Sequence, residues 1–213
     1  GTQKVHTKLE VERREMVLIK KAVKKEIDKA IKRIWITEIC KEYGEGHLLL
    51  EASLQCSLYH HLRNQLKHIL DENNLYIYPE FYFSQFRYHA DIAICEMNMS
   101  METYGLHDHL TDIAAIIELK YGGSSNYIKT DILKLKNYVQ SLGYDCQYYF
   151  GSIDERAECE RMPWLDRRST DNWANGCFTE LNAGRLDGTM YFEVNSYNNM
   201  NTQQKSVLCK FSW

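Results

Sequence analysis

Two acidic residues and one lysine have the types and spacing for metal-assisted chemistry: Asp91, Glu118 and Lys120. Residues Ile113–Ile117 form an apolar run with the length of a buried strand, too short for a free helix. Because side chains alternate along a strand, Glu118 and Lys120 would share one face at its end. A second predicted strand, Tyr88–Cys95, carries Asp91 and could bring it beside Glu118. Two carboxylates can hold a divalent cation and a lysine can orient a water, so this set suits hydrolysis of phosphodiesters.

This pattern resembles the PD-(D/E)XK nuclease superfamily of restriction endonucleases and related repair nucleases: Asp91, 26 intervening residues, then Glu118-x-Lys120. Ala90 stands where the family often has proline. The resemblance implies Mg²⁺ or Mn²⁺ bound by Asp91, Glu118 and the Leu119 carbonyl, with Lys120 orienting or helping to deprotonate the attacking water. The alternative is a surface salt bridge between Glu118 and Lys120 at a strand end, because so short a motif also arises by chance.

Glu51 is a further candidate for the catalytic set. It lies in the first turn of a helix predicted over His47–Leu70, and the apolar face of that helix begins at Leu50 and continues through Leu54, Leu58, Leu62 and Leu66. In the superfamily that the chain resembles, the first core helix often carries a glutamate here that helps to hold a metal-bound water. The alternative role for Glu51 is to stabilise the positive N-terminal end of the helix dipole.

Two lysines of a later helix, Lys129 and Lys134, are candidates to contact a phosphate of nucleic acid. The helix is predicted over Tyr127–Leu142, and within it Asp131 and Lys134 have the spacing of an ion pair. Exonuclease branches of the superfamily carry Gln-x-x-x-Tyr at this place, and this chain has the similar Lys134-x-x-x-Tyr138. The alternative for both lysines is an ordinary solvated helix face.

The predicted order of elements is helix, three strands, helix and strand, which is the αβββαβ core of the restriction-endonuclease-like α/β fold. Its strands are predicted over Leu75–Phe83, Phe86–Glu96, Leu110–Tyr121 and Gln147–Ile153. Pro79 requires a bulge or an edge position in the first strand. We therefore expect a nuclease-like core over residues 47–153, between a basic N-terminal helix in residues 1–46 and a C-terminal extension in residues 154–213.

The two flanking segments have their own patterns. A helix is predicted over residues 7–43, ended by Gly44 and Gly46, and its apolar stripe is interrupted by lysines. Residues 1–33 hold 11 of the 26 Lys and Arg against five acids, which indicates either a helix lying on a phosphate backbone or a solvated face. Residues 154–189 are predicted as loops with a short helix near Asp154–Arg161, followed by strands over Met190–Asn195 and Ser206–Trp213.

Composition narrows the class of protein. The 213 residues are 44% hydrophobic with a net charge of −3, which fits one domain with a sizeable core. Seven scattered cysteines, an odd number without a Cys-x-x-Cys, predict a reducing cytoplasm and no zinc site. No apolar stretch near 20 residues and no signal peptide are found, so we expect no membrane association.

The expected partner is nucleic acid, with DNA favoured, and a homodimer is left open. The rival hypothesis is a binding module that keeps the fold but does no chemistry.

Overall fold

The computed structural model describes residues 21–122, 125–156, 164–165, 172–200 and 207–209. Residues 21–34 are helical and continue as a π-helical turn, η1 (Trp35–Ile39), and then as α2 (Cys40–Gly44). The predicted helix is therefore present from residue 21 onward, and its residues 7–20 lie outside the described part. Its apolar stripe is buried, as expected from the helical spacing of Ile27, Ala30, Ile31 and Ile34.

The second predicted helix is shorter than expected and is broken once. It forms α3 (Glu51–Gln65) and α4 (Lys67–Glu72), separated at Leu66. The start moves from His47 to Glu51 because Leu50 is extended, and the Ser53 hydroxyl oxygen accepts hydrogen bonds from the amides of Leu49 and Leu50. Leu50 is 54% exposed and so does not belong to the buried face, whereas the leucines from Leu54 onward do.

Within the described residues, seven strands form one sheet in which each strand lies beside its neighbours in sequence. They are β1 (Leu75–Phe83), β2 (Tyr88–Met97), β3 (Leu110–Tyr121), β4 (Gln147–Asp154), β5 (Phe178–Leu186), β6 (Thr189–Ser196) and β7 (Val207–Leu208). The pairs β3–β4 and β4–β5 are parallel, and the other pairs are antiparallel. A mixed α/β architecture is therefore confirmed, and Pro79 lies on an edge strand as its missing N–H requires.

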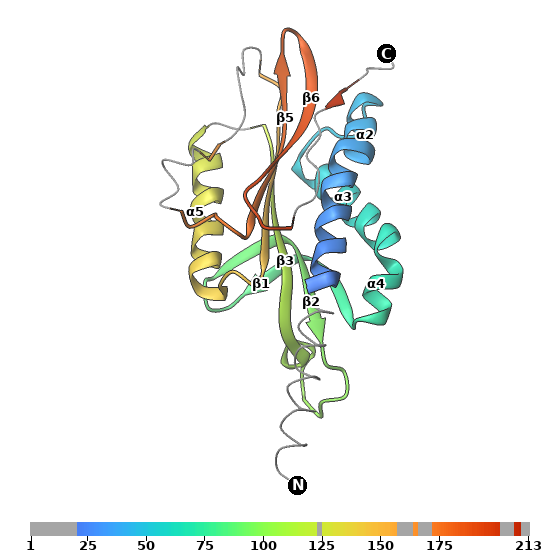
Figure 1. Cartoon of the computed structure of the whole chain (residues 1–213), viewed down its shortest axis with the longest axis vertical. Helices are drawn as coiled ribbons and strands as arrows, with labels where there is room; N and C mark the ends of the chain where they lie inside the picture. Colours follow the sequence, from blue (N-terminus) through green and yellow to red (C-terminus); the bar gives the residue numbers. More distant parts are fainter. Residues whose placement is uncertain (1–20, 123–124, 157–163, 166–171, 201–206, 210–213) are drawn as a thin grey trace.

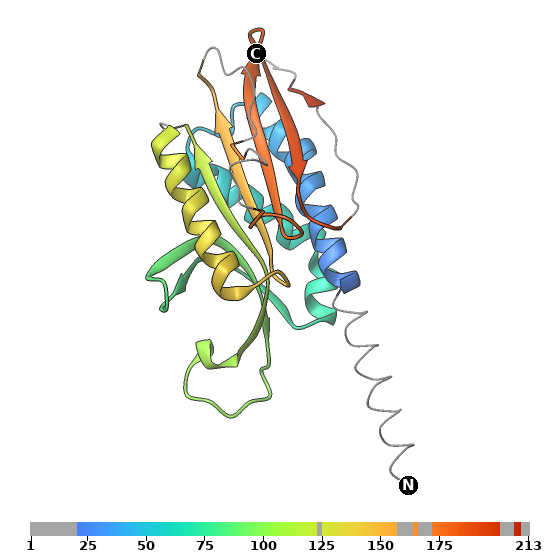
Figure 2. The same ribbon diagram turned by 60° about the vertical axis from the view of Figure 1, so that its left-hand side comes forward.

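Helices cover both faces of this sheet. The connection from β3 to the parallel strand β4 runs through α5 (Ser125–Leu142). This helix ends at Gly143, whose positive φ of 82° is the left-handed conformation that commonly terminates helices. Figure 1 shows α5 on one side of the sheet and α2, α3 and α4 on the other, and the turned view in Figure 2 agrees. Each side has its own apolar cluster, one of which includes Trp35, Leu54 and Leu119, and the other Tyr138, Tyr148 and Phe178.

The largest error of the sequence prediction is β5. Residues 178–186 were expected in a loop region, but they form a buried strand parallel to β4. A two-residue turn, Asp187-Gly188, with φ of 49° and 78°, then leads into β6. A type I′ hairpin turn requires positive φ at both of its central residues, and Asp-Gly is one of its preferred sequences.

The remaining C-terminal predictions are resolved in part. The strand predicted over Met190–Asn195 is contained in β6, and β7 falls inside the one predicted over Ser206–Trp213, most of which lies outside the described residues. The short helix expected near Asp154–Arg161 is not seen at Asp154, which ends β4, and its residues 157–161 are outside the described part. None of the described helices has the length and apolar character needed to cross a membrane.

Candidate active site

The site forms where β2 and β3 separate. Ile92 and Ile117 are the last pair of their ladder, so Asp91 and Glu118 lie one residue beyond it on neighbouring strands. The carboxylate of Asp91 replaces the next ladder bond, because its Oδ2 accepts a hydrogen bond of 2.5 Å from the backbone N–H of Leu119. The Asp91 side chain is therefore fixed against the main chain between Glu118 and Lys120.

Glu118 is buried and only partly satisfied. The residue is 2% exposed, and its Oε2 lies 2.7 Å from the ammonium nitrogen of Lys134 on α5. Its Oε1 has no hydrogen-bond partner among the described residues. Burial raises the pKa of Glu118 well above its usual range, the charge of Asp91 raises it further, and Lys134 opposes both effects. Glu118 thus has one oxygen that is not satisfied by the surrounding protein.

Lys120 links α3, β3 and α5. Its Nζ lies 2.9 Å from Oε2 of Glu51 and 3.2 Å from Oδ2 of Asp131. Burial alone would lower the pKa of Lys120, but hydrogen bonds and charges from these two carboxylates outweigh burial and raise it. Glu51 therefore has a specific partner, Lys120, in addition to its position in the first turn of α3. The alternative of a Glu118–Lys120 salt bridge is not what the structure shows, because Lys120 pairs with Glu51 and Asp131, and Glu118 pairs with Lys134.

The two lysines predicted on α5 have different surroundings. Lys134 is half-buried and points to Glu118, whereas Lys129 is exposed. The expected ion pair between Asp131 and Lys134 is replaced by two longer-range pairs, because Asp131 turns to Lys120 and Lys134 turns to Glu118. Both lysines lie on the helix as predicted, but only Lys134 joins the acidic cluster.

Burial of two adjacent acids makes their ionisation unfavourable. Burial raises the pKa of Asp91 to about 6, although the hydrogen bond from Leu119 lowers it, and the nearby charges of Glu51 and Glu80 raise it. A cation at this place would favour the ionised form of both Asp91 and Glu118, since an opposite charge nearby stabilises a carboxylate. A cation bound at the site would therefore stabilise the ionised carboxylates of Asp91 and Glu118.

One member of the site, Gln55, was missed by sequence reasoning, and the partner of another, Asp131, was predicted wrongly. Gln55 donates through Nε2 to the backbone oxygen of Asp91 at 2.7 Å and to Oε1 of Glu80 at 2.8 Å. Its position four residues after Glu51 on a helix was an available signal, because residues at this spacing share a face. Asp131 was identified, but its partner Lys120 could not be read from the spacing within its own helix.

The donor types at the site are those that a hard divalent cation uses. Asp91 and Glu118 carry carboxylate oxygens, which Mg²⁺ and Mn²⁺ prefer, and the buried Oε1 of Glu118 has no hydrogen-bond partner among the described residues. Among the described residues, no group of three or more His, Cys, Asp and Glu side chains is arranged to hold a metal. The site has only two such side chains, so a carbonyl and waters would have to complete the coordination.

In comparisons with known proteins, no family model, no curated protein and no solved structure matches this chain.

Proposed function

We propose that this protein is a metal-dependent nuclease of the PD-(D/E)XK type that hydrolyses phosphodiester bonds in DNA, in defence or repair. The observation that carries the proposal is the pair of acids Asp91 and Glu118, one residue beyond the last pair of the β2–β3 ladder. Lys120 follows two residues later on β3, and Glu51 and Asp131 hold its ammonium. The order of the broken helix α3–α4, then β1, β2, β3, α5 and β4, with β4 parallel to β3, supports it, because the resembled superfamily has the order αβββαβ.

The residues have separable roles in this proposal. Asp91, Glu118 and the Leu119 carbonyl hold Mg²⁺ or Mn²⁺, which when bound supplies Lewis acidity to activate a water and offset phosphate charge. Lys120 orients that water or stabilises the charge that develops on the phosphate. Glu51 and Asp131 fix the Lys120 ammonium and raise its pKa, so they favour its charged form. A charged Lys120 acts as an electrostatic group and cannot take up the proton of the water.

Lys134 has two possible roles at the site. It already neutralises one oxygen of Glu118, and a substrate phosphate entering beside Glu118 would offer it a second anionic partner. Lys129, exposed on the same helix, could only add a contact to the backbone of the nucleic acid.

A second candidate function is a nuclease-like binding module without catalysis. The Lys134–Glu118 ion pair favours it, because a lysine 2.7 Å from a buried carboxylate can replace the charge that a metal would supply. In that case, the fold would retain nucleic-acid or protein contacts but would not bind the cation.

The deciding experiment combines calorimetric titration of Mn²⁺ with cleavage of labelled single- and double-stranded DNA and RNA. The proposal expects Mn²⁺ binding and cleavage in the wild type and loss of both in Glu118→Gln and Asp91→Asn. Glu72→Gln, an exposed glutamate on α4, is the matched control and should behave as the wild type. A wild-type protein that binds nucleic acid but neither Mn²⁺ nor Mg²⁺ would favour the binding module.

A further inference from the structure

A pocket of about 260 Å³ lies along the edge strand β1, apart from the carboxylate cluster. One wall is the strand itself, and the other is formed by η2 (Leu106–His109) and the ends of β2 and β3. Figure 2 shows the hairpin end of β1 and β2 and the loop carrying η2 both projecting from the lower part of the sheet. The lining residues include Tyr78, Phe81, Tyr82, Met97, Leu106 and His107.

The walls of this pocket suit a flat, mostly apolar guest. Tyr82 is 45% exposed and Leu106 is 56% exposed, and both line the pocket, so two large side chains are left open to solvent there. The rings of Phe81 and His107 lie with their centroids 6.1 Å apart and are tilted by 53°. Polar atoms at the rim come from Glu80 and His107, which can accept or donate hydrogen bonds. Aromatic walls with a few polar groups are the usual surroundings of a stacked nucleobase.

The pocket is connected to the candidate active site by one side chain. Glu80 lies at the rim of the pocket, and its Oε1 accepts a hydrogen bond of 2.8 Å from Gln55. The same amide nitrogen of Gln55 donates to the backbone oxygen of Asp91 at 2.7 Å. The pocket rim and the candidate metal ligand are therefore bridged through a single nitrogen atom.

The geometry of β1 argues against a peptide strand as the occupant. An added strand needs a regular row of donors and acceptors along the edge. Pro79 has no N–H, and Glu80 has a φ of 51°, outside the extended region. Both interruptions fall among the residues that line the pocket, so the edge beside it is a poor template for strand addition.

We propose that this pocket takes an unpaired nucleobase of the nucleic-acid strand whose phosphate lies at Asp91 and Glu118. The proposal rests on the nuclease function proposed above and names its substrate class, which is a single strand or a strand with an unstacked nucleotide beside the cleaved bond. A base in a continuous duplex is stacked and paired and cannot enter a pocket without leaving the helix.

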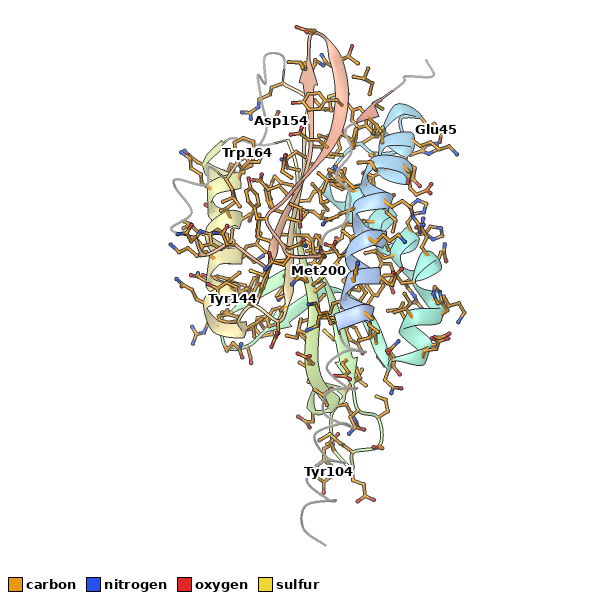
Figure 3. The ribbon with its side chains drawn as sticks, viewed as in Figure 1. Glu45, Tyr104, Tyr144, Asp154, Trp164 and Met200 are labelled. Carbon is orange, nitrogen blue, oxygen red and sulfur yellow. The ribbon has the colours of Figure 1, made fainter. Side chains whose placement is uncertain are left out.

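The test measures binding separately from cleavage, in Ca²⁺ or EDTA, by fluorescence anisotropy of a short labelled oligodeoxythymidylate and of a hairpin duplex. We expect the wild type to prefer the single strand. Tyr82→Ala should weaken its binding by about 10-fold or more, the scale of one lost stacking contact, and Leu106→Ala should weaken it through lost apolar contact. Tyr104→Ala is the matched control, because this tyrosine is fully exposed at the far tip of the loop between β2 and β3 (Figure 3) and does not line the pocket.

A single abasic nucleotide, moved along the oligonucleotide, supplies the second measurement. At one position, the abasic nucleotide should weaken binding by the wild type as much as Tyr82→Ala weakens binding of the intact oligonucleotide. The Tyr82→Ala variant should bind that abasic oligonucleotide as tightly as the wild type binds it. The inference is overturned if both pocket variants bind the single strand as the wild type does, or if the duplex is preferred. It is also overturned if sedimentation shows a dimer that Tyr82→Ala dissociates, because the pocket would then hold a second copy.

Failure of the nuclease proposal gives a different pattern. Pocket-dependent binding of single strands without any cleavage in Mn²⁺ or Mg²⁺ would reject the catalysis and keep the base pocket. Cleavage that Glu118→Gln abolishes, with pocket variants as active and as tightly bound as wild type on single strands, would reject the base pocket and keep the catalysis. Circular dichroism of each variant checks that the fold is unchanged.

Discussion

Lys120 is the residue at which metal binding and chemistry can be separated. Its ammonium lies between Glu51 and Asp131, and it is not a ligand for Mg²⁺ while it is protonated. Glu118, two residues before it, has a different cation, Lys134. Removing Lys120 therefore leaves both candidate metal ligands and their contacts in place.

We predict that Lys120→Ala keeps Mn²⁺ binding but loses about 10²- to 10³-fold in cleavage rate, since one transition-state electrostatic contact is removed. Calorimetry with Mn²⁺, together with single-turnover cleavage, measures the two effects. Lys41→Ala, an exposed lysine on α2, is the control for a general loss of positive charge. Equal cleavage by wild type and Lys120→Ala would mean that Lys120 does not act in the reaction.

At the scale of elements, local patterns predicted the structure well where one strand or helix carried a consistent signal. The strands predicted over Leu75–Phe83 and Leu110–Tyr121 have the bounds of β1 and β3. Leu75–Phe83 is rich in aromatic strand formers, and Leu110–Tyr121 contains a short apolar run and ends at the Gly122-Gly123 pair, so each stretch carries a consistent strand signal. Asp91 and Glu118 could be placed together because neighbouring strands in an antiparallel pair leave few choices of register.

The strand β5 was missed because its sequence contradicts its burial. Buried parallel strands are usually continuous apolar runs, but here Glu180 and Asn182 are both 0% exposed. The structure satisfies one oxygen of each, since Leu165 N–H donates to Oε1 of Glu180 and the Ser152 hydroxyl donates to Oδ1 of Asn182, whereas Glu180 Oε2 and Asn182 Nδ2 have no hydrogen-bond partner among the described residues. The Asp187-Gly188 pair was the available signal, because this dipeptide favours a tight hairpin.

Glu180 makes the stability of the protein depend on pH. Burial raises its pKa to about 8, from about 4.3 in an unfolded chain. The folded state therefore binds this proton more tightly than the unfolded state, and the stability that this group contributes is complete below about pH 4 and is lost as the pH rises to about 8. We predict that Glu180→Gln removes this part of the pH dependence, measured as urea midpoints from pH 4 to pH 8.

The control for this prediction is Glu72→Gln, because Glu72 is exposed on α4. Its urea midpoints should follow those of the wild type at each pH. A Glu180→Gln variant with the wild-type pH profile would show that the Glu180 carboxyl titrates in the folded protein as it does in the unfolded chain.

At the scale of the whole molecule, a buried polar network attaches the N-terminal helix to the far half of the sheet. Asp28 is 0% exposed and accepts hydrogen bonds from Tyr149 on β4 at 2.8 Å and from Asn198 at 2.7 Å. Lys32, one turn later, lies 2.8 Å from Asp28 and donates to Ser196 on β6 at 2.9 Å. The network joins segments that are far apart in sequence, which is why spacing within the helix did not predict it.

We predict that Asp28→Ala destabilises the fold by about 3–5 kcal/mol, because it leaves the Lys32 charge buried without its carboxylate. The control is Asp71→Ala, which breaks an exposed pair of the same i, i+4 spacing, Lys67–Asp71, at 2.6 Å. That change should alter stability by no more than about 0.5 kcal/mol. Urea unfolding of both variants measures the difference, and similar losses would mean that the buried pair is no stronger than a surface pair.

The hydrogen bond from Leu119 N–H to the Asp91 carboxylate has a consequence for spectroscopy. A backbone amide is observed as its own peak in a ¹H–¹⁵N NMR spectrum, and its proton shift depends on the charge of the atom that accepts its bond. Because Asp91 Oδ2 is that acceptor, the Leu119 peak should move when the carboxylate ionises near pH 6 and move again when a cation shares its charge. In Asp91→Asn, the pH-dependent movement should disappear. The main chain of β3 thus carries a built-in reporter of the charge state of the site, readable without a substrate.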